Sequence, residues 1–83
     1  MYEVIVEKSV VKQLQKIPQP YYRKIKIALN SLATHPRPNG YLKLKGREGY
    51  RIRVADYRII YEIKDEQLII LIISIAHRKD VYE

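Results

Sequence analysis

Cysteine is absent from this chain of 83 residues, which excludes disulfide bonds and metal sites built on thiolates. Its absence agrees with a reducing cytoplasm, where we expect the protein to act. Long apolar runs are also missing, because the longest, Leu68–Ile73, is far shorter than the ~20 residues of a membrane-spanning helix. The first residues show no basic segment followed by an apolar one, so we expect no signal peptide and no membrane association.

Several kinds of catalytic site are missing as well. The two histidines, His35 and His77, are far apart and have no cysteine beside them, so the sequence indicates no zinc site. Of Asp56, Glu62, Asp65 and Glu66, only Glu62 is expected to project from a strand face and the others fall in predicted turns, which does not support a two-metal nuclease. Gly46–Gly49 lacks the residues that complete a phosphate-binding loop. We therefore expect neither a metal nor another cofactor.

Charge is strongly unbalanced, with 16 basic and 9 acidic residues, a net charge of +7 and a pI near 9.7. Such a balance favours an anionic partner: nucleic acid, an anionic membrane or an acidic protein. Up to Gly40, seven basic residues are opposed only by Glu3 and Glu7, and a solvated surface accounts for most of them. A second basic cluster follows, made of Lys43, Lys45, Arg47, Arg51, Arg53 and Arg58.

The N-terminal half predicts one strand and two helices, within a single domain that spans residues 1–83. Tyr2–Val6 is rich in β-branched residues and predicts the strand. A helix capped by Ser9 is expected to run to about residue 16. Pro20 suits the first turn of a second helix, from about Tyr21 to Ala33. The short loop between them predicts an antiparallel helical hairpin.

The C-terminal half predicts three strands, Tyr50–Val54, Tyr57–Ile63 and Leu68–Ile75, joined by turns too short for crossover helices. They should pair as an antiparallel meander. Leu68–Ile75 lacks alternation, so we expect it to lie centrally with both faces covered. Tyr41–Gly46 is a connector or a short edge strand. The predicted fold class is therefore α+β, a small antiparallel β-sheet packed against an N-terminal helical hairpin in the order β-α-α-β-β-β.

Arginines gather on one face of two of these strands. Arg51 and Arg53 are two residues apart, so their Cα atoms lie about 6.5–7 Å apart on the same face. Arg58 joins them if the two strands align their core faces. Each guanidinium can hold a phosphate through two parallel hydrogen bonds, which makes the cluster a phosphate-binding candidate. The alternative is a surface ion pair of Arg58 with Glu62 or Asp56.

The end of the chain adds groups that can transfer protons, His77 and Tyr82, with Arg78 between them. Cleaving RNA without a metal needs a base for the 2′-OH, cations for the phosphorane and an acid for the leaving 5′-oxygen. Arginine is a poor base, so proton transfer falls to His77, to Tyr82 or to a group of the target. A structural histidine and a frayed terminal tyrosine are the alternatives.

Taken together, these segments resemble the RelE/ParE superfamily of toxins from type II toxin–antitoxin systems, and most closely its RelE-type mRNA interferases. The resemblance covers nearly the whole chain and rests on Leu44–Gly46, on Tyr50–Ile63 with the sequence YRIRVADYRIIYEI, and on Ser74–Arg78 followed by Val81 and Tyr82. It implies the topology predicted above. It also implies a toxin that inhibits translation as a ribosome-dependent endoribonuclease, cleaving mRNA in the A site by metal-free 2′-OH attack.

The resemblance implies roles for individual residues. Arg58 matches a phosphate-binding catalytic arginine, Arg78 the arginine after the last strand, and Tyr82 a C-terminal tyrosine that orients the cleaved nucleotide. No further helix is expected after Arg78.

Ribosome-dependent members often carry lysines where this chain has Arg51 and Arg53. Lysine can serve as a base when its pKa is lowered and arginine cannot, so His77 becomes the first candidate for the general base. The remaining basic residues of the second cluster are expected to bind RNA: Arg51, Arg53, Lys43, Lys45 and Arg47.

The resemblance also implies partners, namely a small acidic antitoxin similar to RelB, the ribosome with its mRNA, and operator DNA only through the antitoxin complex. A hypothesis of a different class is a binding protein without nuclease activity, either a gyrase inhibitor of the ParE type or an inactive toxin homologue. The ParE branch lacks the arginine and tyrosine set, so Arg58, Arg78 and Tyr82 favour the nuclease.

Overall fold

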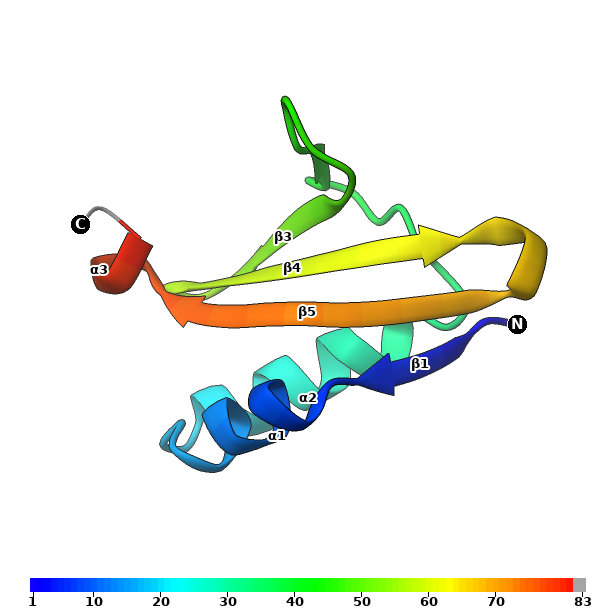
Figure 1. Cartoon of the computed structure of the whole chain (residues 1–83). Helices are drawn as coiled ribbons and strands as arrows, with labels where there is room; N and C mark the ends of the chain where they lie inside the picture. Colours follow the sequence, from blue (N-terminus) through cyan, green and yellow to red (C-terminus); the bar gives the residue numbers. More distant parts are fainter. Residues whose placement is uncertain (82–83) are drawn as a thin grey trace.

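The structure is a computed structural model, and it describes residues 1–81 (Figure 1). In chain order the elements are β1 (Glu3–Val6), α1 (Lys8–Gln15), α2 (Tyr21–Ser31), β2 (Leu42–Lys43), β3 (Tyr50–Val54), β4 (Tyr57–Lys64), the 3-10 helix η1 (Asp65–Gln67), β5 (Ile69–His77) and α3 (Arg78–Val81). The single turn α3 is an element that the sequence did not predict. Within the described residues, no helix is long and apolar enough to cross a membrane.

The five strands form one sheet in the order β1-β5-β4-β3-β2. The pairs from β2 to β5 are antiparallel, which confirms the predicted meander and the α+β class. β1 adds a parallel pair at the edge of β5, so the complete sheet is mixed. Alternation within a strand defines its faces but not its partner, and for this reason the sequence left the place of β1 open.

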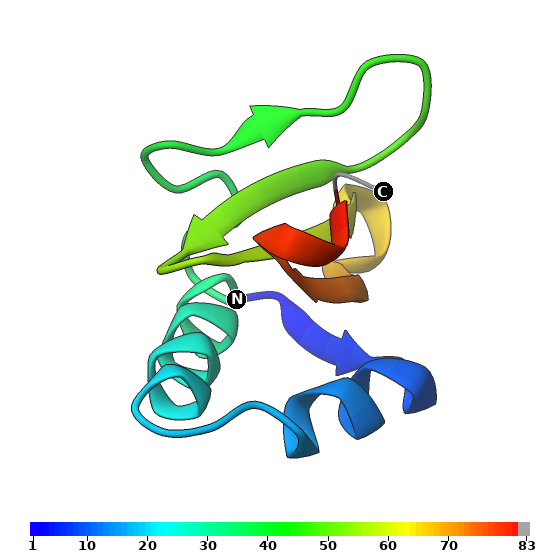
Figure 2. The same ribbon diagram turned by 90° about the vertical axis from the view of Figure 1, so that its left-hand side faces the viewer.

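Both helices cover the same face of the sheet (Figures 1 and 2). α1 packs on β5, and α2 packs on β3 after the chain doubles back. α1 begins at Lys8 with Glu7 at its N-cap and no side-chain cap bond, so the predicted Ser9 cap is wrong. Each helix buries two apolar residues one turn apart, as an amphipathic stripe requires: Val10 and Leu14 in α1, Ile25 and Leu29 in α2.

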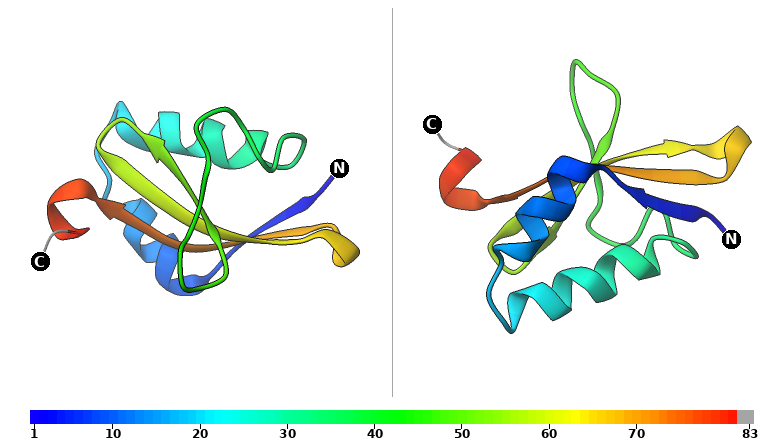
Figure 3. Two further views of the ribbon diagram at one scale, coloured as in Figure 1. Left: turned by 90° about the horizontal axis from the view of Figure 1, so that it is seen from above. Right: turned by 60° about the horizontal axis from the view of Figure 1, so that its bottom comes forward.

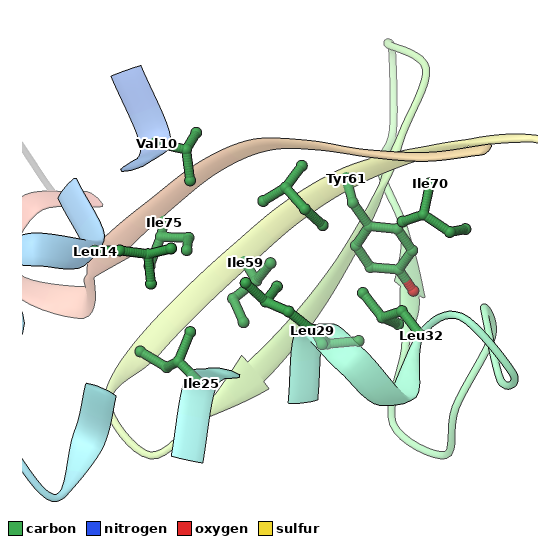
Figure 4. Close-up of a cluster of buried hydrophobic side chains, with 11 residues drawn as sticks. Val10, Leu14, Ile25, Leu29, Leu32, Ile59, Tyr61, Ile70 and Ile75 are labelled. Atoms are coloured by element: carbon green, nitrogen blue, oxygen red, sulfur yellow. The ribbon is translucent and has the colours of Figure 1, made fainter. Parts of the chain in front are cut away.

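The core lies between the helices and the sheet, and Tyr61 of β4 is its largest fully buried side chain (Figure 4). Isoleucines from three strands and leucines from both helices belong to the same buried cluster, and Ile70 and Leu32 lie near its ring (Figure 4). The Tyr61 hydroxyl donates a hydrogen bond of 2.8 Å to the carbonyl oxygen of Pro36. This bond ties the loop after α2 to the sheet and satisfies a polar atom at the margin of the core.

Tyr61 makes stability depend on alkaline pH. Burial raises its pKa to about 12, whereas an unfolded tyrosine ionises near pH 10. As pH rises from about 10 to 12, the unfolded chain loses this proton and the folded protein keeps it, so the free energy of unfolding falls. We expect Tyr61→Phe to remove that part of the loss, besides a pH-independent cost of about 1 kcal/mol for the hydrogen bond. Denaturant unfolding at about pH 9 and pH 11 tests this, and a difference between the two proteins that is constant with pH would contradict it.

A β-bulge interrupts β5. Ile60 pairs with Ser74 and the next residue of β4, Tyr61, pairs with Ile72, which leaves Ile73 without a partner on β4. The buried residues are accordingly Ile70, Ile72 and Ile75. The other face of the strand is only half-buried, so the prediction that both faces are covered is wrong. The bulge exchanges the two faces of the strand beyond Ile73, so one alternating pattern does not describe the whole strand.

Gln13 of α1 completes the free edge of β5 beyond the end of β1. Its Oε1 accepts a hydrogen bond of 3.1 Å from the backbone N–H of Ile75. We expect Gln13→Ala to lower the free energy of unfolding by about 1–3 kcal/mol, because a partly buried N–H loses its partner.

The matched control is Gln15→Ala, on the same helix, since Gln15 makes no side-chain hydrogen bond within the described residues. Urea unfolding of both variants measures the difference, and equal losses would contradict this role of Gln13.

Candidate functional site

Three arginines meet on the face of the sheet that the helices do not cover. Arg53 of β3 lies directly opposite Arg58 of β4, and Arg51 lies opposite Ile60. On its other side Arg58 pairs with Ala76 of β5, and the Nε of its guanidinium is buried. The core faces of β3 and β4 are therefore aligned, as the prediction for Arg58 requires. We call the surface formed by Arg51, Arg53 and Arg58 the arginine face.

The arginine face places like charges opposite each other. Directly opposed side chains have Cβ atoms about 4.5–5.5 Å apart, and like charges there are destabilising. The two acids considered as partners of Arg58 contact other cations: Glu62 holds Lys64 at 3.0 Å, and Asp56 lies 3.9 Å from Arg78. A bound anion between Arg53 and Arg58 relieves their repulsion, so the arrangement suits a phosphate.

Residues 42–49 project beside the arginine face, and we call them the arm (Figure 1, and Figure 3, left). Lys45 and Arg47 lie on it, exposed. Gly49 fixes its base, with φ of +122° and room for no side chain, since a Cβ there lies 3.3 Å from the carbonyl oxygen of Tyr61. The arm thereby holds two cations next to a face that already carries three.

Lys43 is separated from the arginines. It pairs with Tyr50, whose ring lies on the helix side of the sheet, and its Nζ lies 5.7 Å from the centre of that ring. The Arg37 guanidinium lies 5.5 Å from the same ring centre. Lys43 thus belongs to the opposite side of the edge strand.

Arg37 also joins a network that the sequence did not reveal. It bonds Asp65 at 3.1 Å, and the Tyr2 hydroxyl donates a bond of 2.6 Å to the same carboxylate. The Tyr2 hydroxyl and the Arg37 guanidinium hold the pKa of Asp65 below its usual range. These residues are 28 and 63 positions apart in sequence, so no local pattern signals the contact. The network fixes the chain end and the loop after α2, away from the arginine face.

His77 lies on the helix side of the sheet. It pairs with Tyr57, and the two rings meet edge to face with centres 5.1 Å apart. Gln13, Lys16 and Ile17 complete a shallow groove of about 340 Å³ around it. Its Nδ1 accepts a hydrogen bond of 3.1 Å from the backbone N–H of Lys79. The structure therefore does not bring His77 together with Arg58, and this ring instead supports the start of α3.

Arg78 lies at the same end of the sheet as Arg53 and Arg58. Its backbone N–H donates a bond of 2.7 Å to the carbonyl oxygen of Asp56, in the β3–β4 turn. Tyr82, the other predicted group of this segment, lies outside the described residues. Within the described part, no three His, Asp or Glu side chains gather in a way that would hold a metal ion.

Comparison with protein families gives one match that covers residues 4–82, to the family described as the ParE toxin of type II toxin–antitoxin systems. A curated relative, Toxin RelE3 of Methanocaldococcus jannaschii, is 31% identical over 98% of this chain and 96% of its own length.

Solved structures show the same similarity. The RelE–RelB complex of Pyrococcus horikoshii contains a chain that is 34% identical, with a TM-score of 0.84 over 93% of this chain and 94% of that one. The RelBE2 toxin–antitoxin complex of Mycobacterium tuberculosis contains one that is 26% identical, with a TM-score of 0.77 over 93% and 98%. The fold described above is the fold of these chains.

Proposed function

Since the chain belongs to the RelE/ParE superfamily of toxins from type II toxin–antitoxin systems, we propose that it is a RelE-type endoribonuclease that cleaves mRNA in the ribosomal A site. Cleavage proceeds by attack of the 2′-OH on the adjacent phosphate, without a metal, and stops translation. The toxin acts in the cytoplasm as a single domain of residues 1–83.

The observation that carries this proposal is the arginine face. Attack of the 2′-OH creates a phosphorane with more negative charge than the starting phosphate, and fixed cations stabilise that charge most. Arg58 is half-buried and lies opposite the exposed Arg53 across the strand pair, so the sheet places both residues on one face before RNA arrives. Arg58 is the catalytic phosphate ligand, and Arg51 and Arg53 bind the neighbouring phosphates. Arg78 approaches from the end of the sheet.

Proton transfer has fewer candidates than the sequence offered. His77 lies across the sheet from Arg58 and accepts a backbone hydrogen bond at Nδ1, so we assign it to the support of α3. The base and the acid are then Tyr82, which follows α3 in the chain, and groups that the ribosome or the RNA supplies. Dependence on the ribosome follows naturally when the toxin alone lacks a complete set of proton-transfer groups.

The distribution of charge supports docking on a large polyanion. From Lys8 to Arg47 the chain has ten basic residues and no acidic one. Within the described residues, none of the basic side chains of α1 and α2 forms an ion pair. Lys45 and Arg47 of the arm bind RNA next to the arginine face, and Lys43 does so from the opposite side of the edge strand. Basic residues on both layers allow simultaneous contact with mRNA and ribosomal RNA.

The partner that neutralises the toxin is an acidic antitoxin similar to RelB. The similar chains from Pyrococcus horikoshii and Mycobacterium tuberculosis occur in complexes of this kind. A net charge of +7 gives an acidic partner fast association and electrostatic complementarity. Operator DNA is contacted only through the complex.

The test is primer extension on an mRNA programmed into ribosomes, with purified protein and a parallel reaction that lacks ribosomes. We expect cuts at A-site codons only when ribosomes are present, and no cuts when the antitoxin is added in excess. Chelation of divalent ions in the reaction without ribosomes, if cuts occur there, separates a metal-free reaction from a metal-dependent one.

Absence of cuts in both reactions, from a folded protein, would overturn the nuclease. The alternative is then a gyrase inhibitor of the ParE type, and a DNA supercoiling assay with gyrase is the measurement that distinguishes it.

A further inference from the structure

Asp56 is an acidic residue in the turn at the end of the sheet where Arg53, Arg58 and Arg78 lie. It is the only acidic residue between Glu48 and Glu62 in the sequence. It occupies the β3–β4 turn with Ala55, whose φ is +54°. The register places Arg53 and Arg58 opposite each other two positions before this turn. The Asp56 carboxylate therefore lies among the positive charges of Arg53, Arg58 and Arg78.

Two contacts of different strength connect Asp56 to Arg78. The backbone contact is short, because the Arg78 N–H donates to the Asp56 carbonyl oxygen at 2.7 Å. The side-chain contact is loose, with 3.9 Å between Arg78 Nη1 and Asp56 Oδ1, and the two side chains are 66% and 59% exposed. The first contact fixes the backbone of Arg78 at the turn, and the second leaves its guanidinium free to change partner.

We propose that Asp56 is a positioning residue that occupies the Arg78 guanidinium in the free protein and releases it to an RNA phosphate. The proposal rests on the proposed function and specifies how its phosphate site is regulated. A carboxylate and a phosphate offer a guanidinium the same pair of acceptor oxygens. A phosphate that bridges Arg58 and Arg78 therefore displaces the Asp56 carboxylate, while the backbone bond keeps Arg78 in reach.

The Asp56 carboxylate therefore keeps the Arg78 guanidinium near the turn and competes with RNA phosphate for it. An exposed ion pair is easily exchanged, so the carboxylate opposes RNA only weakly. Asp56→Asn removes the charge and keeps the size of the side chain and the carbonyl oxygen that binds Arg78. We expect this variant to bind RNA about two- to fivefold more tightly, the range that the loss of one exposed ion pair gives.

The measurement is fluorescence anisotropy of a single-stranded RNA of about ten nucleotides, with 2′-O-methyl groups throughout so that it cannot be cleaved. Four proteins are compared: wild type, Asp56→Asn, Arg78→Ala and the double variant. In the Arg78→Ala background, we expect Asp56→Asn to leave the dissociation constant unchanged. A purely long-range effect of one charge gives the same tightening in both backgrounds, and a structural role of Asp56 gives weaker binding in both.

Glu62→Gln is the matched control, because it makes the same change of charge on the same face and its partner is Lys64. If Glu62→Gln tightens RNA binding as much as Asp56→Asn does, the proposal is overturned. It is also overturned if Asp56→Asn still tightens RNA binding in the Arg78→Ala background. If Arg78→Ala weakens RNA binding but Asp56→Asn does not change it, the inference alone is overturned. The proposed function then stands. Failure of the wild type to bind this RNA overturns the inference, and the proposed function is tested separately by the cleavage assay on programmed ribosomes.

Discussion

Arg58→Ala is expected to lower the rate of mRNA cleavage about 10²–10³-fold, the usual loss when one fixed donor to a developing negative charge is removed. Arg58 pairs with Arg53 on β3 and with Ala76 on β5, so its backbone is placed by the middle of the sheet and not by a loop. The protein should remain folded and bind its antitoxin. Single-turnover cleavage on programmed ribosomes, with thermal unfolding of the same samples, measures both effects.

Two variants sharpen this experiment. Arg58→Lys keeps the charge and loses the planar pair of donors, so we expect a rate between those of the wild type and Arg58→Ala. Arg23→Ala makes the same chemical change on α2, in the helix layer, where Arg23 is exposed and forms no ion pair within the described residues. At saturating ribosome concentration, where weaker docking does not limit the reaction, it should cleave at the wild-type single-turnover rate. A folded Arg58→Ala protein that also does so would exclude Arg58 from the reaction.

The sequence predicted the arginine face because β3 and β4 are regular. Each alternates between apolar and polar residues, and the two-residue turn between them fixes their register. The predicted bounds of β3 agree with the observed Tyr50–Val54, and Arg58 lies on the same face of the sheet as Arg51 and Arg53. These residues could be placed from the two-residue alternation of a strand and from a short turn. Both can be read from residues that are neighbours in the sequence.

His77 could not be placed in this way, and the bulge at Ile73 is the reason. In an unbroken strand the residues that share a face with buried Ile70 and Ile72 are Ser74 and Ala76, and His77 lies on the arginine face. The extra residue exchanges the two faces beyond it, so that Ile75 and His77 turn to the helices and Ala76 lies beside Arg58. A run of apolar residues on both sides of the bulge hides this exchange from the sequence.

The largest effect on stability should come from a buried residue just beyond the bulge. Ile75 is 3% exposed and packs in the core. We expect Ile75→Ala to lower the free energy of unfolding by about 2–5 kcal/mol, through lost burial and the cavity left behind. A domain of this length has only about 5–10 kcal/mol in total, so the variant should be near the limit of folding without its antitoxin. Urea unfolding, with and without the antitoxin, measures the loss.

The matched variant is Ile73→Ala, which removes the same atoms two residues earlier. Ile73 has no partner on β4 and lies half-buried on the far face, so its loss should stay below about 1 kcal/mol. In a strand without a bulge, residues 73 and 75 share a face and the two losses are similar. A large difference therefore establishes the exchange of faces between them. His77 lies two residues after Ile75 and therefore on the same face of the strand. That result thus also removes His77 from the arginine face and leaves proton transfer to Tyr82 and the target. Equal losses would return His77 to the site as its base.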